Sequence, residues 1–151
     1  MTSLQELTAN RPTRTLDDQE ILLVQGEGGG DFYILLSGKL AVVRDGVSIA
    51  TINQPGTLVG EMSVLRGTPY SATVRAEGPA KVRVIRDATA LLDSEPGLAR
   101  RVAALVAGRL DATSALLVDL AKQNKDKASE QNLLRRILAT LYAPVTAERD
   151  S

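Results

Sequence analysis

Between Thr15 and Ile85 the apolar residues come in short runs, and the turns between the runs are rich in glycine, aspartate and asparagine. The runs predict strands over residues 21–24, 32–36, 39–44, 47–52, 57–59, 71–76 and 80–85. Residues 47–52 alternate with a period of two, and the Asp45-Gly46 pair before them is typical of a hairpin turn. Short strands at regular spacing predict a β-sandwich or a jelly-roll barrel. We expect a mainly β fold with added helices, built on a double-stranded β-helix (jelly-roll) barrel.

From Asp87 onward the apolar period becomes helical. A short helix is predicted over residues 89–92, and Ser94 and Pro96 are suitable residues for the start of a long helix that ends near Ala121. Heptad spacing links Val106, Leu110, Thr113, Leu117 and Leu120, and a second apolar stripe contains Leu98, Val102, Leu105 and Leu116. One stripe can pack on the barrel while the other meets a partner helix, so we expect a homodimer through residues 94–121.

Four segments follow from these patterns. Residues 1–14 are expected to form an N-terminal helical or linker segment, and residues 15–93 the barrel. Residues 94–121 form the long helix, and residues 122–151 a polar linker and a short C-terminal helix. The C-terminal helix is predicted from the spacing of Leu133, Leu134, Ile137, Leu138 and Leu141.

Composition excludes several classes of chemistry. The 151 residues contain no cysteine and no histidine, so thiol catalysis and disulfides are excluded, and the usual general base and commonest metal ligand are missing. We therefore expect no catalytic residue, no metal site and no enzymatic activity. The formal net charge of zero gives no electrostatic indication of a nucleic-acid or membrane partner. No apolar run is long enough to span a bilayer, and no signal peptide is recognisable, so we expect a cytoplasmic protein.

The most distinctive segment lies between the expected strands 57–59 and 71–76. Gly60 and Glu61 precede a short helical turn, Met62 to Leu65, which Gly67 breaks and Pro69 stops. The first amides of a helix have no partner inside it, so such a turn can form a cradle for an anion, and phosphate is the natural guest. Glu61 would repel a phosphate alone, but it suits a ligand that also offers a hydroxyl, such as a ribose 2′-OH.

Residues 59–64 (Val-Gly-Glu-Met-Ser-Val) and 69–74 (Pro-Tyr-Ser-Ala-Thr-Val) resemble the phosphate-binding cassette of the cyclic-nucleotide-binding domain family. The resemblance extends roughly over residues 17–121 and includes Gly38 and the Pro55-Gly56 turn. It implies a cyclic-nucleotide ligand, with no other cofactor, bound by Gly60, Glu61, Met62, Ser63, Tyr70, Ser71 and Ala72. Tyr70 stands where the family carries the arginine that pairs with the cyclic phosphate.

Residues 107–114 resemble the dimerisation helix of catabolite-activator-type bacterial regulators. This resemblance implies that Thr113 and Ser114 contact the exocyclic amine of adenine, one from each subunit, and it favours cAMP over cGMP. The alternative is that the Thr113 hydroxyl binds a carbonyl of its own helix. In those regulators a DNA-binding winged helix follows, whereas residues 122–151 offer neither a helix-turn-helix nor a basic recognition helix. We therefore expect a sensor without a DNA reader and without direct DNA binding.

Two functions remain in competition. The first is a cyclic-nucleotide sensor, in which the ligand rearranges the long helix in a homodimer and an unknown downstream protein receives the signal. The second is a degenerate relative without a mononucleotide ligand, which serves as an interaction or dimerisation module or binds another nucleotide, such as a cyclic dinucleotide. Loss of a charge-assisted arginine contact weakens binding by about ten- to a hundredfold. Arg66 or Arg75 could replace the charge, although strand alternation directs Arg75 away from the side of Val74.

Overall fold

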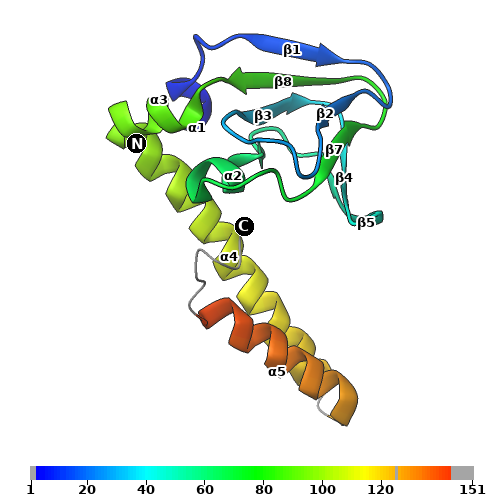
Figure 1. Cartoon of the computed structure of the whole chain (residues 1–151). Coiled ribbons are helices and arrows are strands. Elements are labelled where there is room, and N and C mark those ends of the chain that lie inside the picture. Colours follow the sequence, from blue (N-terminus) through cyan, green and yellow to red (C-terminus); the bar gives the residue numbers. More distant parts are fainter. Residues whose placement is uncertain (1–2, 125, 144–151) are drawn as a thin grey trace. The chain divides into compact units, whose positions relative to one another are not determined.

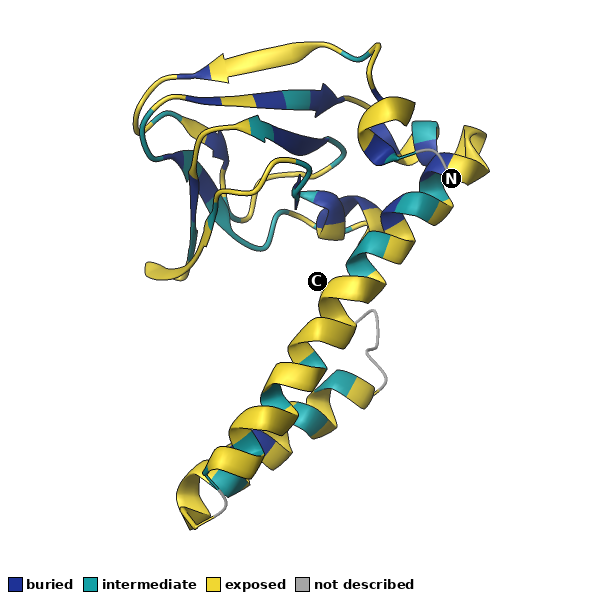
Figure 2. Ribbon diagram, turned by 180° about the vertical axis from the view of Figure 1, so that it is seen from behind, coloured by how far each residue is buried: buried dark blue, intermediate teal, exposed yellow. Residues whose placement is uncertain are grey.

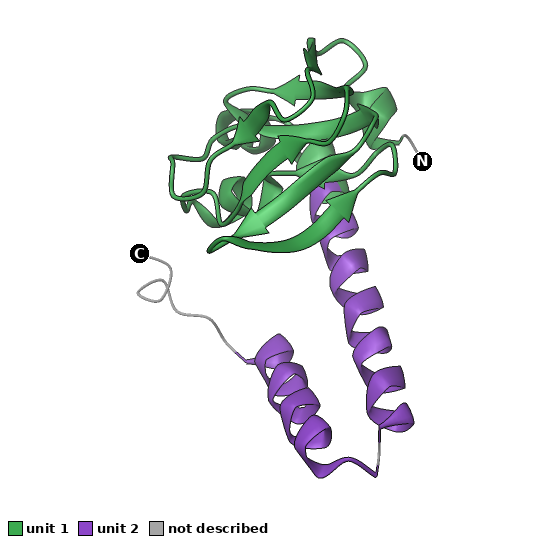
Figure 3. Ribbon diagram, turned by 90° about the vertical axis from the view of Figure 1, so that its right-hand side faces the viewer, with its two compact units in different colours: residues 1–101 green, residues 102–151 purple. Residues whose placement is uncertain are grey.

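The computed structural model describes residues 3–124 and 126–143. The chain divides into two compact units, residues 1–101 and residues 102–151, which Figure 3 colours green and purple.

The first unit contains two four-stranded antiparallel sheets (Figure 1). The first sheet has the spatial order β1 (Thr13–Leu16), β8 (Ala80–Ile85), β3 (Phe32–Ser37) and β6 (Leu58–Val59). The second sheet has the order β2 (Ile21–Leu23), β7 (Thr73–Ala76), β4 (Leu40–Arg44) and β5 (Val47–Ile52). This arrangement confirms the predicted fold class of a mainly β jelly roll followed by a long helix.

Both sheets contribute to one apolar core. Buried side chains alternate with more exposed ones along the strands; in β8, for example, Val82 and Val84 are buried, whereas Lys81 is exposed. The same period of two in β7 buries Val74 and Ala76. Members of the core cluster come from both sheets and include Leu16, Leu23, Tyr33, Leu35, Leu40, Val59, Val74 and Val82. Figure 2 shows these buried segments in dark blue.

The N-terminal region contains a short helix and a strand. The helix α1 (Leu4–Leu7) is short and begins with a capping box, in which the Ser3 hydroxyl accepts from the Glu6 amide and the Glu6 carboxylate accepts from the Ser3 amide. Strand β1 follows at Thr13 and pairs with β8 along its whole length. Three of its four residues are exposed and only Leu16 is buried, so no apolar alternation marks this strand in the sequence.

Helices connect and follow the sheets. The first unit contains α2 (Glu61–Arg66), α3 (Ala88–Ser94) and the beginning of α4 (Pro96–Gln123). The second unit contains the rest of α4 and α5 (Ala128–Tyr142), which run antiparallel as a helical hairpin (Figure 3). The expected helix over residues 133–141 therefore belongs to a longer helix that begins at Ala128. No helix among the described residues is long and apolar enough to cross a membrane.

Candidate functional site

The predicted phosphate cassette forms a turn of helix between β6 and β7. Gly60 precedes α2 with φ +84°, and Gly67 follows it with φ +67° and donates its amide to the Ser63 carbonyl. Both backbone conformations are left-handed, which glycine adopts without steric cost. A Cβ atom at Gly60 would also lie 3.2 Å from Leu23 Cδ1 and 3.2 Å from Tyr70 Cε1. Glycine is therefore required at position 60 both by the backbone and by the neighbouring side chains.

The first turn of α2 combines buried polar groups with an exposed apolar one. Glu61 is only 4% exposed and Ser63 is 5% exposed, whereas Met62 is 43% exposed. The Ser63 hydroxyl donates to the Gly60 carbonyl at 3.3 Å, which ties the turn to the residue that starts it. A carboxylate is rarely buried without polar partners, because removing its charge from water is costly. The burial of Glu61 thus fixes an acidic group at the base of the cassette.

Tyr70 is built into the protein rather than projecting from it. Its ring is half-buried and packs against the apolar core cluster, and its hydroxyl donates to the Asp31 carbonyl at 2.8 Å. Its amide donates to the Glu27 carbonyl, and its own carbonyl accepts from the Gly26 amide. Burial, followed by the nearby Tyr33 and Asp31, raises the pKa of Tyr70 to about 12. The hydroxyl is therefore protonated at neutral pH, and its single donor is already used.

Ser71 and Ala72 complete the cassette. Both are half-buried and directly precede β7, which begins at Thr73. The Thr73 hydroxyl accepts from the Gln25 amide at 3.0 Å, which joins the end of the cassette to the loop after β2. Seven of the predicted site residues thus belong to the one segment between β6 and β7: Gly60, Glu61, Met62, Ser63, Tyr70, Ser71 and Ala72.

A glycine-rich loop next to the cassette was predicted only as a turn, yet it lies against the site. A Cβ atom at Gly29 would lie 2.2 Å from the Ser63 hydroxyl oxygen, so the loop backbone approaches α2 closely. With the cassette and α3, the loop borders an open pocket of about 310 Å³, lined by Gly28, Gly29, Gly30, Ser63, Gly67, Thr68, Pro69 and Thr89. Three consecutive glycines are the sequence signal that could have identified this close approach.

The same loop also holds the start of α3. The Gly30 carbonyl accepts from the Ala88 amide at 2.7 Å, and the Asp31 carboxylate accepts from the Asp87 amide at 3.0 Å. Because the Asp31 carbonyl accepts from Tyr70, one residue connects the cassette to the first turn of α3. Asp31 therefore links Tyr70 to the start of α3 through two hydrogen bonds.

The two cations considered as substitutes for the missing arginine differ in position. Arg66 ends α2 and is exposed. Arg75 follows the core residue Val74 on β7, and the alternation of the strand directs it to the opposite face of the second sheet. Its Nη1 atom is buried there without a hydrogen-bond partner among the described residues.

Thr113 and Ser114 lie in the second unit, on α4. The Thr113 hydroxyl donates to the Arg109 carbonyl at 2.8 Å, which is the intrahelical bond that the sequence offered as an alternative. The Ser114 hydroxyl lies 3.3 Å from the Tyr142 hydroxyl on α5. Within the described ranges, no group of three or more acidic side chains could hold a metal ion.

Comparison with known proteins gives one consistent result. The sequence matches the cyclic nucleotide-binding domain family over residues 13–92, just over half of the chain. A cAMP-dependent protein kinase regulatory subunit from Yarrowia lipolytica is 36% identical over 63 residues, which cover 42% of this chain and 16% of that protein.

Solved structures agree. The catabolite activator protein of Thermus thermophilus is 30% identical with a TM-score of 0.60, and the match covers 76% of this chain and 56% of that one. The N-terminal domain of a transcriptional regulator from Streptomyces coelicolor is 30% identical with a TM-score of 0.55, over 72% of this chain and 81% of that one. This chain thus spans a small part of the kinase subunit and just over half of the activator.

Proposed function

This chain belongs to the cyclic nucleotide-binding domain family, and we propose that it is a regulatory sensor that binds cAMP in preference to cGMP. The phosphate would be received by the amides at the start of α2 and by Ser71 and Ala72, and the ribose hydroxyl by Glu61. The burial of Glu61 beside these amides carries the proposal. A carboxylate has about four acceptor positions, so Glu61 can serve an internal partner and a ribose hydroxyl together.

The absence of the family arginine should weaken the binding of the cyclic phosphate. The Tyr70 hydroxyl already donates to the Asp31 carbonyl, so the phosphate would depend on backbone amides and on the Ser71 hydroxyl. Neutral donors form weaker hydrogen bonds with an anion than a guanidinium does. We therefore expect weaker binding than a cassette with arginine at this position would give.

Signalling in this proposal passes from the cassette to the helices. Ligand contacts that differ between two helix positions would shift the equilibrium between them. The helix α4 would form a homodimer, in which Thr113 and Ser114 meet the exocyclic amine of adenine. The output would go to a downstream protein in the cytoplasm that the chain itself does not identify.

Titration calorimetry with the nucleotide-free protein tests this proposal. Saturable binding of cAMP, tighter than that of cGMP, is the expected result. A Glu61→Gln variant should retain the fold and bind more weakly, because an amide is a poorer acceptor for the ribose hydroxyl than a carboxylate. Titrations without heat for either nucleotide, in a protein whose circular dichroism is that of a folded domain, would refute the sensor.

A second function is favoured by the contacts of Tyr70. Its ring packs on the core cluster and its hydroxyl is bound internally, as expected of a residue that fills space instead of meeting a ligand. In this alternative the domain is an interaction or dimerisation module, or it binds a different nucleotide. A cyclic dinucleotide included in the same calorimetric series separates the last possibility from the other two.

A further inference from the structure

The second half of α4 is half-buried along a single stripe. Between residues 107 and 123, all of which the structure describes, only three side chains are not exposed: Ser114, Leu117 and Ala121. Residues spaced three and four positions apart share one face of a helix, and we call these three the Ser114 stripe. Ser114 is one of the two residues proposed to meet the adenine, and Leu117 belongs to the apolar heptad of α4. The least exposed part of α4 is therefore the part on which the proposed base contact depends.

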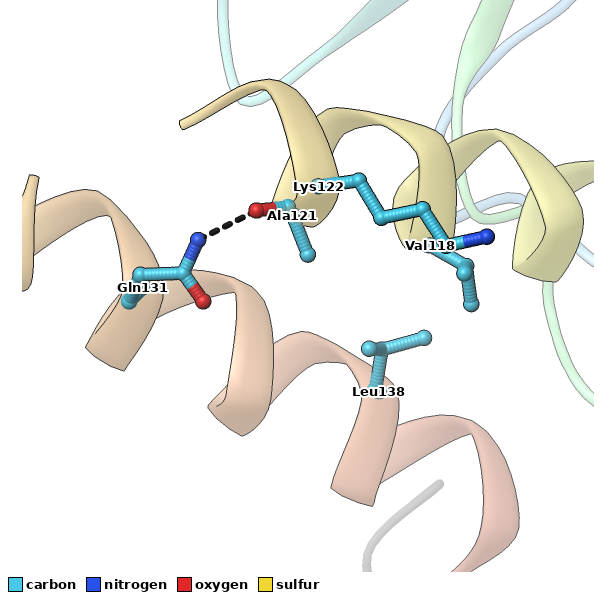
Figure 4. A pocket seen from close by; sticks show the side chains of 5 residues that line it. All are labelled: Val118, Ala121, Lys122, Gln131 and Leu138. Carbon is cyan, nitrogen blue, oxygen red and sulfur yellow. Dashed lines mark hydrogen bonds between the residues drawn. The ribbon is translucent and has the colours of Figure 1, made fainter. Parts of the chain in front are cut away.

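The element that covers the Ser114 stripe is α5, which runs antiparallel to α4 (Figure 3). The less exposed side chains of α5 recur with the same periodicity: Gln131, Leu134, Leu138 and Leu141. Leu134 is the most buried of them, with an exposed fraction of 8%. At one end of the hairpin the Gln131 side-chain amide donates to the Ala121 carbonyl (Figure 4). At the other end the hydroxyls of Ser114 and Tyr142 form a hydrogen bond of 3.3 Å, so α5 contacts both ends of the stripe.

The contact between α5 and α4 is shallow. Within α5, which the structure describes in full, only Leu134 is buried, and its neighbour Leu133 is 53% exposed. Beside Leu138 the two helices leave an open pocket of about 450 Å³, which Val118 and Lys122 line from α4 (Figure 4). Side chains that border such a gap lose part of their dispersion contacts. Since α5 has only 15 residues, a length at which an isolated helix is marginal in water, its docking should be reversible.

We propose that α5 is an autoinhibitory helix, which must leave the Ser114 stripe before α4 can contact the base of a bound nucleotide. The inference rests on the proposed function and adds a regulatory step to the same site. A face of α4 that lies under α5 cannot also receive adenine, so the closed hairpin and the base contact exclude each other. By linkage, a ligand that needs the open state weakens the docking of α5 by the same factor by which docking weakens the ligand.

Calorimetric titration of cAMP into the full chain tests the competition. Leu134→Ala removes the most buried contact of α5 and should tighten binding, because the apparent dissociation constant is the intrinsic one divided by the open fraction. A closed state about ten times as populated as the open state gives a gain of about tenfold. Leu133→Ala is the matched control, since it makes the same change at the adjacent position, where the side chain is 53% exposed. The control should bind cAMP as the wild type does.

Cross-linking tests the opposite change. The chain has no cysteine, so Val118→Cys and Leu138→Cys, at two positions that line the same pocket, introduce the only thiols. A short bismaleimide between them would hold α5 on α4 and should weaken cAMP binding at least about tenfold. The control is the same double variant capped with N-ethylmaleimide, which modifies both thiols without joining the helices. Equal affinities of the bridged and the capped protein would overturn the proposal.

Hydrogen exchange gives a measurement that does not depend on affinity. Saturating cAMP should accelerate the exchange of the α5 amides, because the ligand selects the open state and a released helix of this length is only marginally stable. Unchanged or slower exchange in α5 with cAMP bound would contradict the release of this helix.

The calorimetric series also separates this inference from the sensor itself. If the wild type, Leu134→Ala and Leu133→Ala bind cAMP with equal affinity, α5 does not compete with the ligand and the sensor stands. If none of the three binds cAMP or cGMP, the sensor is refuted, and the autoinhibition with it. A gain in affinity that is confined to Leu134→Ala supports both.

Discussion

Tyr70 occupies the position at which the family's arginine binds the cyclic phosphate. Where the family has a guanidinium that points to the ligand, this chain has a phenol that points to the Asp31 carbonyl. The exchange removes a positive charge and adds a core contact at the same position. The side chain at position 70 therefore affects both ligand binding and the stability of the fold. Different substitutions at this position test the two effects one at a time.

Tyr70→Arg should tighten cAMP binding. A charge-assisted contact with the cyclic phosphate contributes roughly 1.5–3 kcal/mol, which corresponds to about ten- to a hundredfold in the dissociation constant. Calorimetry measures the change, and Ile49→Arg is the control, because Ile49 is an exposed residue of β5 outside the cassette. Unchanged or weaker binding by the Tyr70 variant would mean that the site has been rebuilt for another ligand.

Tyr70→Phe should lower the free energy of unfolding by about 1 kcal/mol, because it removes the hydrogen bond to the half-buried Asp31 while preserving the ring. Tyr142→Phe removes the same atom from a residue that is 79% exposed and should cost less than about 0.5 kcal/mol. Urea denaturation of both variants provides the comparison. Equal losses would show that the bond from Tyr70 to Asp31 stabilises the protein no more than the exposed Tyr142 hydroxyl does.

The contribution of Tyr70 to the free energy of unfolding should depend on pH in the alkaline range. Burial raises the pKa of Tyr70 from 10.0 to about 12, so the folded state retains the proton that the unfolded state releases. The resulting stabilisation is complete below pH 10 and is lost as the pH rises from 10 through 12. The stability advantage of wild type over Tyr70→Phe should thus shrink in this window, which urea titrations at successive pH values can follow. A constant difference would contradict the pKa assignment.

At the scale of elements, α2 is defined mainly by its two terminal glycines. It has only six residues, so its position depends on the left-handed turns at Gly60 and Gly67 and on its contact with the glycine-rich loop. The loop in turn donates no side chain to this contact: Gly29 allows α2 to approach because it lacks a Cβ atom.

Gly60→Ala should therefore destabilise the domain by about 1–2 kcal/mol, since an alanine in the left-handed region is strained and its Cβ would contact Leu23 and Tyr70. Gly28→Ala is the matched control, because its Cβ would meet nothing within 4 Å. Thermal unfolding of the two variants tests the difference. An equal effect at both positions would argue that α2 tolerates a shift of its first residue.

The sequence predicted the elements whose pattern is local. The strands from β2 to β8 alternate or are bounded by glycine turns, and the helices α3, α4 and α5 carry a helical period. Strand β1 was not predicted, because three of its four side chains are exposed and show no apolar alternation. The strand is defined by its backbone pairing with β8, which lies far away in the sequence. In the same way, the cassette residues were visible as a motif. The bond from Tyr70 to Asp31 spans 39 positions and could only come from the fold.

At the scale of the whole molecule, one helix belongs to both compact units. The boundary between the units falls after Arg101, inside α4, so the polypeptide continues from the β unit into the hairpin without leaving helical conformation. Helices propagate cooperatively, and their interior is harder to interrupt than a flexible linker. A ligand that stabilises the first unit should therefore also raise the melting temperature of the helix α4, which continues from it.

Saturating cAMP should raise the melting temperature of the whole chain. A ligand at a hundred times its dissociation constant stabilises the folded state by about 2.7 kcal/mol, equivalent to roughly 5–11 °C for a protein of this size. Adenosine 5′-monophosphate, which has the same base and sugar but an open phosphate, serves as the control and should have a smaller effect. A melting temperature indifferent to cAMP would speak for the module without a mononucleotide ligand.

The closeness of Tyr70 to Tyr33 also makes the cassette observable without a label. The chain has no tryptophan and three tyrosines, and two of these lie together in or against the core cluster. Two of the three tyrosine fluorophores of this protein thus lie beside the cassette, and an event that withdraws the Tyr70 phenol from its carbonyl acceptor should change the ultraviolet emission.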